Sequence, residues 1–137
     1  MTLDEAYEAV AAAFTTYWND ETPIAWDDNE FVADKKPEYV RFSWQIQGGS
    51  QAALGPKSLQ RYEGVLFVQV FTVRGKGTQS KRNRILQQRV MDFLTGEAAQ
   101  QTGVVFYDSG PRYIGPTNAW QQTNVSSLFW FDGIRAA

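Results

Sequence analysis

The chain has 137 residues, of which 43% are hydrophobic and 15% aromatic, and this suits one domain with a packed core. It contains no cysteine and no histidine, which excludes disulfides, thiolate metal sites and catalysis by either side chain. The formal net charge of −2 does not favour a protein that coats nucleic acid. We therefore expect residues 1–137 to form a single domain.

The charges are distributed unevenly along the chain. Residues 1–38 carry ten acidic side chains against two lysines, whereas residues 74–91 carry six basic side chains and no acidic ones. Two interpretations follow from this asymmetry. The two segments attract each other between copies of the chain, or they neutralise each other within one monomer.

The first predicted element is a helix from Leu3 to about Trp18, because apolar residues recur there at steps of three and four. Thr2 and Glu5 are placed to form a capping box at its start. Residues 19–37 are polar and bounded by prolines, so we expect an irregular segment. Three apolar residues are expected to anchor it: Ile24, Trp26 and Phe31.

Two strands are predicted next. Glu38–Gln47 alternates apolar and polar residues, which predicts a strand with one buried and one wet face. Residues 48–58 are small and polar, and they predict a flexible loop too long for a tight hairpin. Val65–Val73 is apolar on both faces, which is typical of a central strand covered on both sides.

A second helix is predicted from Thr78 or Gln79 to Leu94, with a buried stripe formed by Ile85, Leu86, Val90, Phe93 and Leu94. Three further strands are expected, separated by turn-forming sequences: Gly103–Tyr107, Arg112–Ile114 and Trp120–Phe131. The order α-β-β-α-β-β-β predicts an α+β domain, a mostly antiparallel sheet of about five strands with two helices packed on it. A sheet face that the helices leave uncovered would meet water or another subunit.

The segment around the second helix joins a strand, a glycine turn and a row of cations. Such a segment could bind phosphate, nucleic acid or an acidic partner. Lys76 lies between Gly75 and Gly77, so neither the P-loop nor the dinucleotide-binding pattern fits. No recognisable nucleic-acid-binding motif surrounds the cations, and a partner-facing surface is the favoured interpretation. The candidate contact residues are Arg74, Lys76, Lys81, Arg82, Arg84 and Arg89.

The acidic residues Asp27, Asp28 and Glu30 are candidates for the opposite side of such a contact. They do not form a calcium loop, because Phe31 and Val32 occupy positions that require an oxygen ligand and a glycine. We interpret the group as a solvated acidic loop.

An enzymatic alternative rests on three acids near predicted strand ends. Glu63, Asp108 and Asp132 could hold a metal ion for a hydrolase or nuclease. They lack a recognisable spacing with a lysine base, and acids at such places are more often turn formers. We therefore expect no catalysis and no cofactor.

The order of several short motifs carries a resemblance that covers almost the whole chain. The motifs follow the amphipathic first helix and are Pro23-Ile24-Ala25-Trp26 with Asn29, Tyr39-Val40-Arg41-Phe42, Gln51-Ala52-Ala53-Leu54-Gly55, Arg61-x-x-Gly64 and Gly75-Lys76-Gly77. In this order the chain resembles the tail terminator (minor tail protein U-like) family of long-tailed bacteriophages and prophages.

The resemblance implies a structural role in virion assembly. Members of the family are thought to form a hexameric ring that caps the tail tube, stops its polymerisation and presents a surface for head joining. The implied partners are further copies of the chain, the tail tube protein and a head-completion or connector protein. The implied location is the virion, and the host cytoplasm during assembly, with no membrane involved. A nucleic-acid-binding module that uses residues 74–89 is the alternative.

Overall fold

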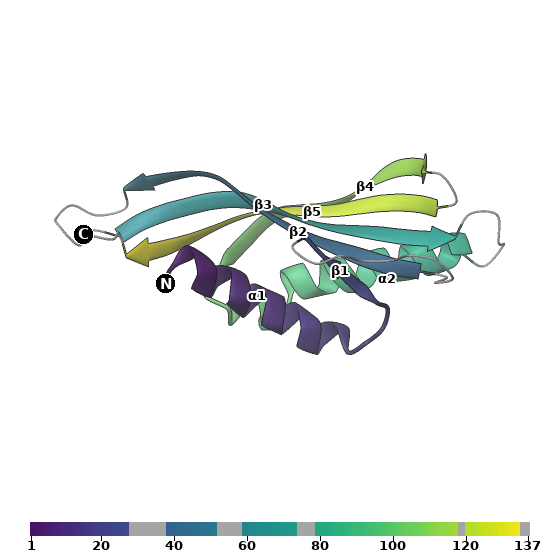
Figure 1. The fold of residues 1–137 in the computed structure, drawn as a ribbon, viewed down its shortest axis with the longest axis horizontal. Helices are drawn as coiled ribbons and strands as arrows, with labels where there is room; N and C mark the ends of the chain where they lie inside the picture. The colour runs from purple at the N-terminus through teal and green to yellow at the C-terminus, as the bar shows by residue number, and fades with distance from the viewer. Residues whose placement is uncertain (28–37, 52–58, 74–78, 118–119, 135–137) are drawn as a thin grey trace.

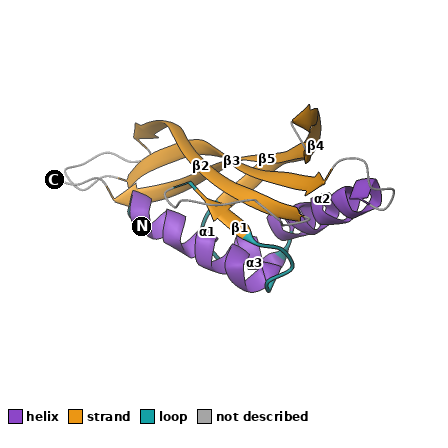
Figure 2. Cartoon of the chain, turned by 45° about the vertical axis from the view of Figure 1, so that its right-hand side comes forward, coloured by secondary structure: helices purple, strands orange, loops and turns teal. Residues whose placement is uncertain are grey.

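Two layers make up the fold, a twisted sheet and a pair of long helices that cover one of its faces (Figures 1 and 2). The computed structural model describes residues 1–27, 38–51, 59–73, 79–117 and 120–134. The strands lie in the order β1-β2-β3-β5-β4. The elements are α1 Leu3–Trp18, β1 Ile24–Trp26, β2 Glu38–Gln51, β3 Leu59–Val73, α2 Gln79–Thr95, α3 Glu97–Gln100, β4 Val105–Thr117 and β5 Trp120–Ile134.

The predicted fold class is confirmed, with one parallel pairing in an otherwise antiparallel sheet. β2, β3, β5 and β4 pair antiparallel, whereas β1 runs parallel to β2, with Ile24 opposite Val40. β1 lies in the segment that was expected to be irregular. Three residues are too few to show a periodicity in the sequence. This strand forms because β2 offers it backbone hydrogen-bond partners.

The two strands expected at Gly103–Tyr107 and Arg112–Ile114 are one bent strand, β4. The turn-like sequence between them forms a β-bulge, in which Asp108 and Ser109 face a single residue of β5. Asp108 has a φ of 51°, and the Ser109 hydroxyl donates a hydrogen bond of 2.7 Å to that of Ser127. The expected total of five strands is right, because the missing β1 and the merged β4 offset each other.

The end of the strand predicted at Glu38–Gln47 and the start of the strand predicted at Val65–Val73 also differ from the prediction. β2 continues to Gln51 and β3 begins at Leu59, so residues 48–51 belong to a strand and not to a loop. Residues 52–58 lie outside the described residues. Gly64 of β3 is required by close packing, since a Cβ there would clash with the Gln45 carbonyl oxygen and lie 2.6 Å from the ring of Phe129.

The start of α1 follows its predicted capping box. The Thr2 hydroxyl accepts a hydrogen bond from the Glu5 amide, and the Glu5 carboxylate accepts one from the Thr2 amide, both at 3.1 Å. The two bonds satisfy amide groups that the helix cannot pair internally. Hydrogen bonding to Thr2 also lowers the pKa of the Glu5 carboxyl.

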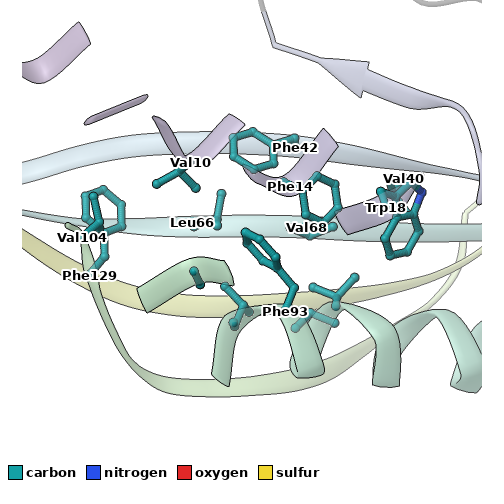
Figure 3. Close-up of a cluster of buried hydrophobic side chains, with 14 of the residues drawn as sticks. Val10, Phe14, Trp18, Val40, Phe42, Leu66, Val68, Phe93, Val104 and Phe129 are labelled. Carbon is teal, nitrogen blue, oxygen red and sulfur yellow. The ribbon is translucent and has the colours of Figure 1, made fainter. Parts of the chain in front are cut away.

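The main hydrophobic core lies between the two long helices and the sheet (Figure 3). Phe14 is central to it, with ring centres of Trp18 at 5.2 Å, Phe42 at 5.5 Å and Phe93 at 5.2 Å. The stripe at three- and four-residue steps in α1 therefore does what the sequence predicts, and it joins both helices to the sheet.

The face of the sheet turned away from the helices, here the outer face, departs from expectation. β3 is the central strand, but the helices cover only one of its faces (Figure 2). A small aromatic cluster buries part of the other face, where Tyr39 stacks on Phe71 at 4.6 Å and meets Trp120 edge-on at 5.1 Å. The prediction of cover on both sides holds only in part: no described helix lies on this face, but Val65 and Phe71 of β3 are buried there, and side chains of neighbouring strands pack on Phe71.

Candidate functional site

The structure describes only part of the predicted contact set. Arg74, Lys76, Asp28 and Glu30 lie outside the described residues, and Asp27 is exposed after β1. Four cations of α2 are described, and they divide into two kinds. Arg82 and Arg89 bind other groups of the same chain. Lys81 and Arg84 are exposed.

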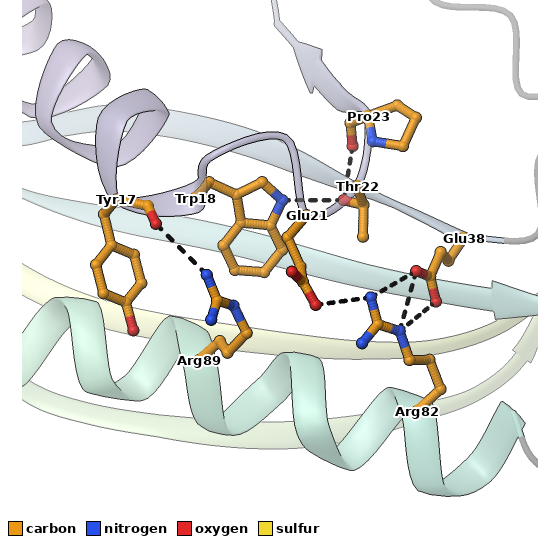
Figure 4. Close-up of polar contacts among 8 residues, drawn as sticks. All are labelled: Tyr17, Trp18, Glu21, Thr22, Pro23, Glu38, Arg82 and Arg89. Atoms are coloured by element: carbon orange, nitrogen blue, oxygen red, sulfur yellow. Dashed lines mark hydrogen bonds and ion pairs between the residues drawn. The ribbon is translucent and has the colours of Figure 1, made fainter.

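Arg82 binds two acids of the N-terminal third (Figure 4). Its Nε donates to the two carboxylate oxygens of Glu38 at 3.0 and 2.7 Å, and its Nη2 donates to one of them at 2.7 Å. Nη2 also lies 2.9 Å from a carboxylate oxygen of Glu21. The hydrogen bonds with Glu38 are the main cause of a raised pKa of the Arg82 guanidinium. The oppositely charged segments therefore neutralise each other in part within one monomer.

Arg89 stabilises the end of α1. Its Nη2 donates to the Tyr17 carbonyl at 3.4 Å, and its guanidinium lies 5.4 and 5.5 Å from the rings of Tyr17 and Trp18 (Figure 4). The last turn of α1 has no basic residue of its own. Because the final carbonyls of a helix are unpaired and carry partial negative charge, a cation from α2 is favourable there.

Replacing Arg82 by glutamine is expected to lower the free energy of unfolding by about 1–3 kcal/mol, because Glu38 would lose charged hydrogen bonds while only 15% exposed. Arg84→Gln is the matched control on the same helix, and as an exposed residue it should change stability by about 0.5 kcal/mol or less. Urea denaturation of both variants measures the difference. Equal stabilities would show that the Arg82 ion pairs do not hold α2 to β2.

The remaining cations form an exposed strip on the first turns of α2. Lys81 and Arg84 make no ion pair within the described ranges, and Ile85 beside them is 42% exposed. The buried stripe predicted for this helix is therefore wrong at Ile85. A buried asparagine, Asn83, takes that place against the sheet.

Asn83 is the centre of a buried hydrogen-bond network that sequence reasoning missed. Its Nδ2 donates to the Thr72 hydroxyl at 3.0 Å and to the Gln121 carbonyl at 3.2 Å. Its Oδ1 accepts from Gln87 at 2.7 Å and from the Thr123 hydroxyl at 2.9 Å. The four-residue spacing of Asn83 and Gln87 was a usable signal, since it places both amides on one helix face.

A second ion pair lies on the outer face. Arg61 donates two hydrogen bonds to Asp132, at 2.9 and 3.2 Å, and its guanidinium lies 3.9 Å from the ring centre of Trp130. The bonds from Arg61 lower the pKa of the Asp132 carboxyl. The pair is therefore formed at neutral pH, and it fixes an aromatic and charged patch between β3 and β5.

The structure does not place the three candidate metal ligands around one site. Asp132 is engaged by Arg61, Asp108 lies exposed in the β4 bulge, and Glu63 is exposed on β3. Among the residues that the structure describes, no three acidic side chains come together as a metal site. The three acids are not brought together.

A groove of about 510 Å³ lies where β4 begins, next to the C-terminal end of α2 and the short α3. Its lining combines apolar and polar residues: Leu94, Thr95, Gln100 and residues 103–109. Val105 and Tyr107 flank it with 42% and 40% of their surface exposed. This groove lies at a sheet edge.

Comparison with known proteins identifies the fold but no function. No protein-family model matches the chain, and no curated protein matches its sequence. One solved structure, of a protein without a functional name, is similar over 96% of both chains, with a TM-score of 0.57 and 16% identity. No helix in the described part of the chain is long and apolar enough to cross a membrane.

Proposed function

We propose that this protein is a structural assembly protein of the tail terminator kind. Copies of the chain form a ring that caps a phage tail tube, stops its polymerisation and offers a surface for head joining. The resemblance in motif order over almost the full chain supports this role, as does a sheet whose outer face carries no helix among the described residues. The assignment implies no catalytic residue and no cofactor.

The observation that carries the proposal is the opposite charge that the first turns of the two long helices expose. α1 begins at one end of the long axis and α2 begins at the other (Figure 1). The first turns of α1 expose Asp4 and Glu8, whereas the first turns of α2 expose Lys81 and Arg84. A ring built with the strands along its axis would place these two acids on one rim and these two cations on the other. Such rims suit a protein that joins two different structures.

The test reverses the exposed cations and leaves the internal ones intact. Lys81→Glu combined with Arg84→Glu is expected to abolish binding to tail tubes, while the monomer stays folded because neither side chain is buried. Electron microscopy of tubes assembled from a phage tail tube protein measures capping and tube length. Binding of the unchanged protein should weaken as salt is raised.

The matched control is Lys81→Arg combined with Arg84→Lys, which keeps both charges and should cap tubes normally. Arg82 is left unchanged in both variants, since its reversal would break the contacts with Glu21 and Glu38. Tubes of normal length capped by the charge-reversed variant would refute the role of this rim. Retardation of DNA at low salt that is lost on charge reversal, without any tube binding, would favour the nucleic-acid-binding alternative.

A further inference from the structure

We propose that copies of this chain join head to tail through their sheet edges, with the free half of β2 in one copy pairing with the open half of β4 in the next. The inference rests on the proposed self-assembly and specifies the surface that makes it. The two sheet edges are protected against pairing with a further strand in some parts and unprotected in others, and the unprotected parts define this surface.

The edge at β2 is only partly covered. β1 pairs with β2 at Val40–Phe42, and beyond Phe42 no described strand lies on that side. The remaining residues of β2, Ser43–Gln51, contain neither a charged residue nor a proline, and their one bulge lies at Gln47, so that Ser43–Ile46 is the regular and unprotected stretch. Natural sheets protect exposed edges with these residue types, because unpaired backbone groups attract other strands. Ile46 in this stretch is 39% exposed.

The edge at β4 is protected in one half only. Its second half carries Pro111 and Pro116 and a bulge at Ile114, which disfavour a further strand. Its first half, Val105–Tyr107, has no proline and no bulge until the next residue. The exposed apolar side chains that flank the groove lie in this first half.

The two unprotected stretches lie at the same level of the sheet. Ile46 pairs with Gly64, and Gly64 pairs with Phe129. Phe129 in turn pairs with Phe106 of β4. By the same register, the part of β2 that β1 covers lies level with Pro111. Both edges are therefore open in one half of the sheet and blocked in the other half.

The strand directions fit a head-to-tail arrangement. β2 is antiparallel to β3, β3 to β5, and β5 to β4, so β2 and β4 run in opposite directions. A neighbouring copy in the same orientation would therefore place its β2 antiparallel to β4, which continues the pattern of the sheet. The contact uses two different edges, and such interfaces close into rings or grow into filaments.

The groove beside β4 supplies a place for a side chain of the neighbour. Ile46 alternates with outward residues and shares the core-facing side of β2 with Phe42. Phe106 of β4 also points to the core side, where it lines the groove. In the continued sheet, the neighbour's Ile46 would project toward this groove. Added strands bind through backbone hydrogen bonds and gain specificity from such pockets.

Disulfide cross-linking tests the pairing directly, because the natural chain has no cysteine. Ser43→Cys, Gln45→Cys and Gln47→Cys, each combined with Tyr107→Cys, sample the possible registers. Oxidation is expected to give a ladder of covalent oligomers for at least one combination. Gln45→Cys with Arg112→Cys is the matched control in the blocked half of β4, and it should give no ladder.

A second measurement places a lysine in each open edge. Ile46→Lys and Val105→Lys are expected to lose the oligomer in sedimentation velocity with unchanged circular dichroism. Leu3→Lys is the control, since Leu3 is 44% exposed but lies on α1. Equal loss of the oligomer in the control would overturn the inference.

The remaining outcomes separate this inference from the proposed function. Oligomers that form normally and cap tubes, but give no ladder in any combination, would overturn edge pairing and leave the proposed function standing. Covalent dimers from Tyr107→Cys alone would show that two β4 edges pair with each other, which also overturns the inference. A chain that stays monomeric at all concentrations and on tail tubes would overturn both.

Discussion

Phe14→Ala is expected to lower the free energy of unfolding by about 3–5 kcal/mol, the largest effect that we predict for a single residue. Phe14 is fully buried and contacts aromatic rings from α1, β2 and α2, so its removal leaves a cavity where both layers of the fold meet. Because small domains are stable by only about 5–15 kcal/mol, the variant would be marginally folded.

The measurement is equilibrium urea denaturation followed by tryptophan fluorescence and by circular dichroism. Leu3→Ala is the matched control, an apolar residue of the same helix that is exposed, and it should change stability by about 0.5 kcal/mol or less. A loss below about 1 kcal/mol for Phe14→Ala would mean that α1 does not pack as described.

Asn83→Leu is expected to cost about 2–4 kcal/mol, because it leaves several buried hydrogen-bonding groups without a partner. The hydroxyls of Thr72 and Thr123 and the amide of Gln87 all bind Asn83, and both threonines are almost fully buried. The network joins α2 to β3 and β5. Its loss should therefore loosen the helix that carries the exposed cations.

A double-mutant cycle separates this network from simple packing. Thr72→Val combined with Asn83→Leu removes donor and acceptor together, so it should cost less than the sum of the two single changes. Gln88→Ala is the control on the same helix, since Gln88 is exposed and bonds only Asp92 in the described chain. Strict additivity of the two changes would show that Asn83 does not act through Thr72.

These variants also clarify the functional tests. Arg82, Arg89 and Asn83 attach α2 to the rest of the fold, so changes there act through stability. Lys81 and Arg84 stand on the opposite side of the same helix and can be changed without that effect. The row of cations that is continuous in sequence therefore has two separate roles in the structure.

The local elements were largely predictable because their signals lie within a few residues. The capping box of Thr2 and Glu5 and the apolar steps of α1 depend on backbone geometry alone, and both are confirmed. The strand β2 is confirmed from Glu38 onward, although Ile46 of the predicted buried face is exposed and Tyr39 of the other face is buried. Where the chain forms long elements with one buried face, period and capping were sufficient.

The errors share a physical cause, which is that a distant segment decides the outcome. β1 exists because β2 offers it backbone partners, and the turn-like residues of β4 become a bulge because β5 runs alongside. Ile85 is exposed because the amide of Asn83 meets Thr72 and Thr123 on the sheet. A short sequence window contains none of these partners.

The sequence by itself determined the fold class, the long helices, the central strands and the separation of acidic and basic segments. Only the tertiary structure decided which cations face outward, because Glu21 and Glu38 reach Arg82 across gaps of many residues. It also decided which parts of the sheet edges are open, since strand register and bulge positions depend on pairing between distant strands. Charge and period are local properties, whereas exposure depends on the whole packed chain.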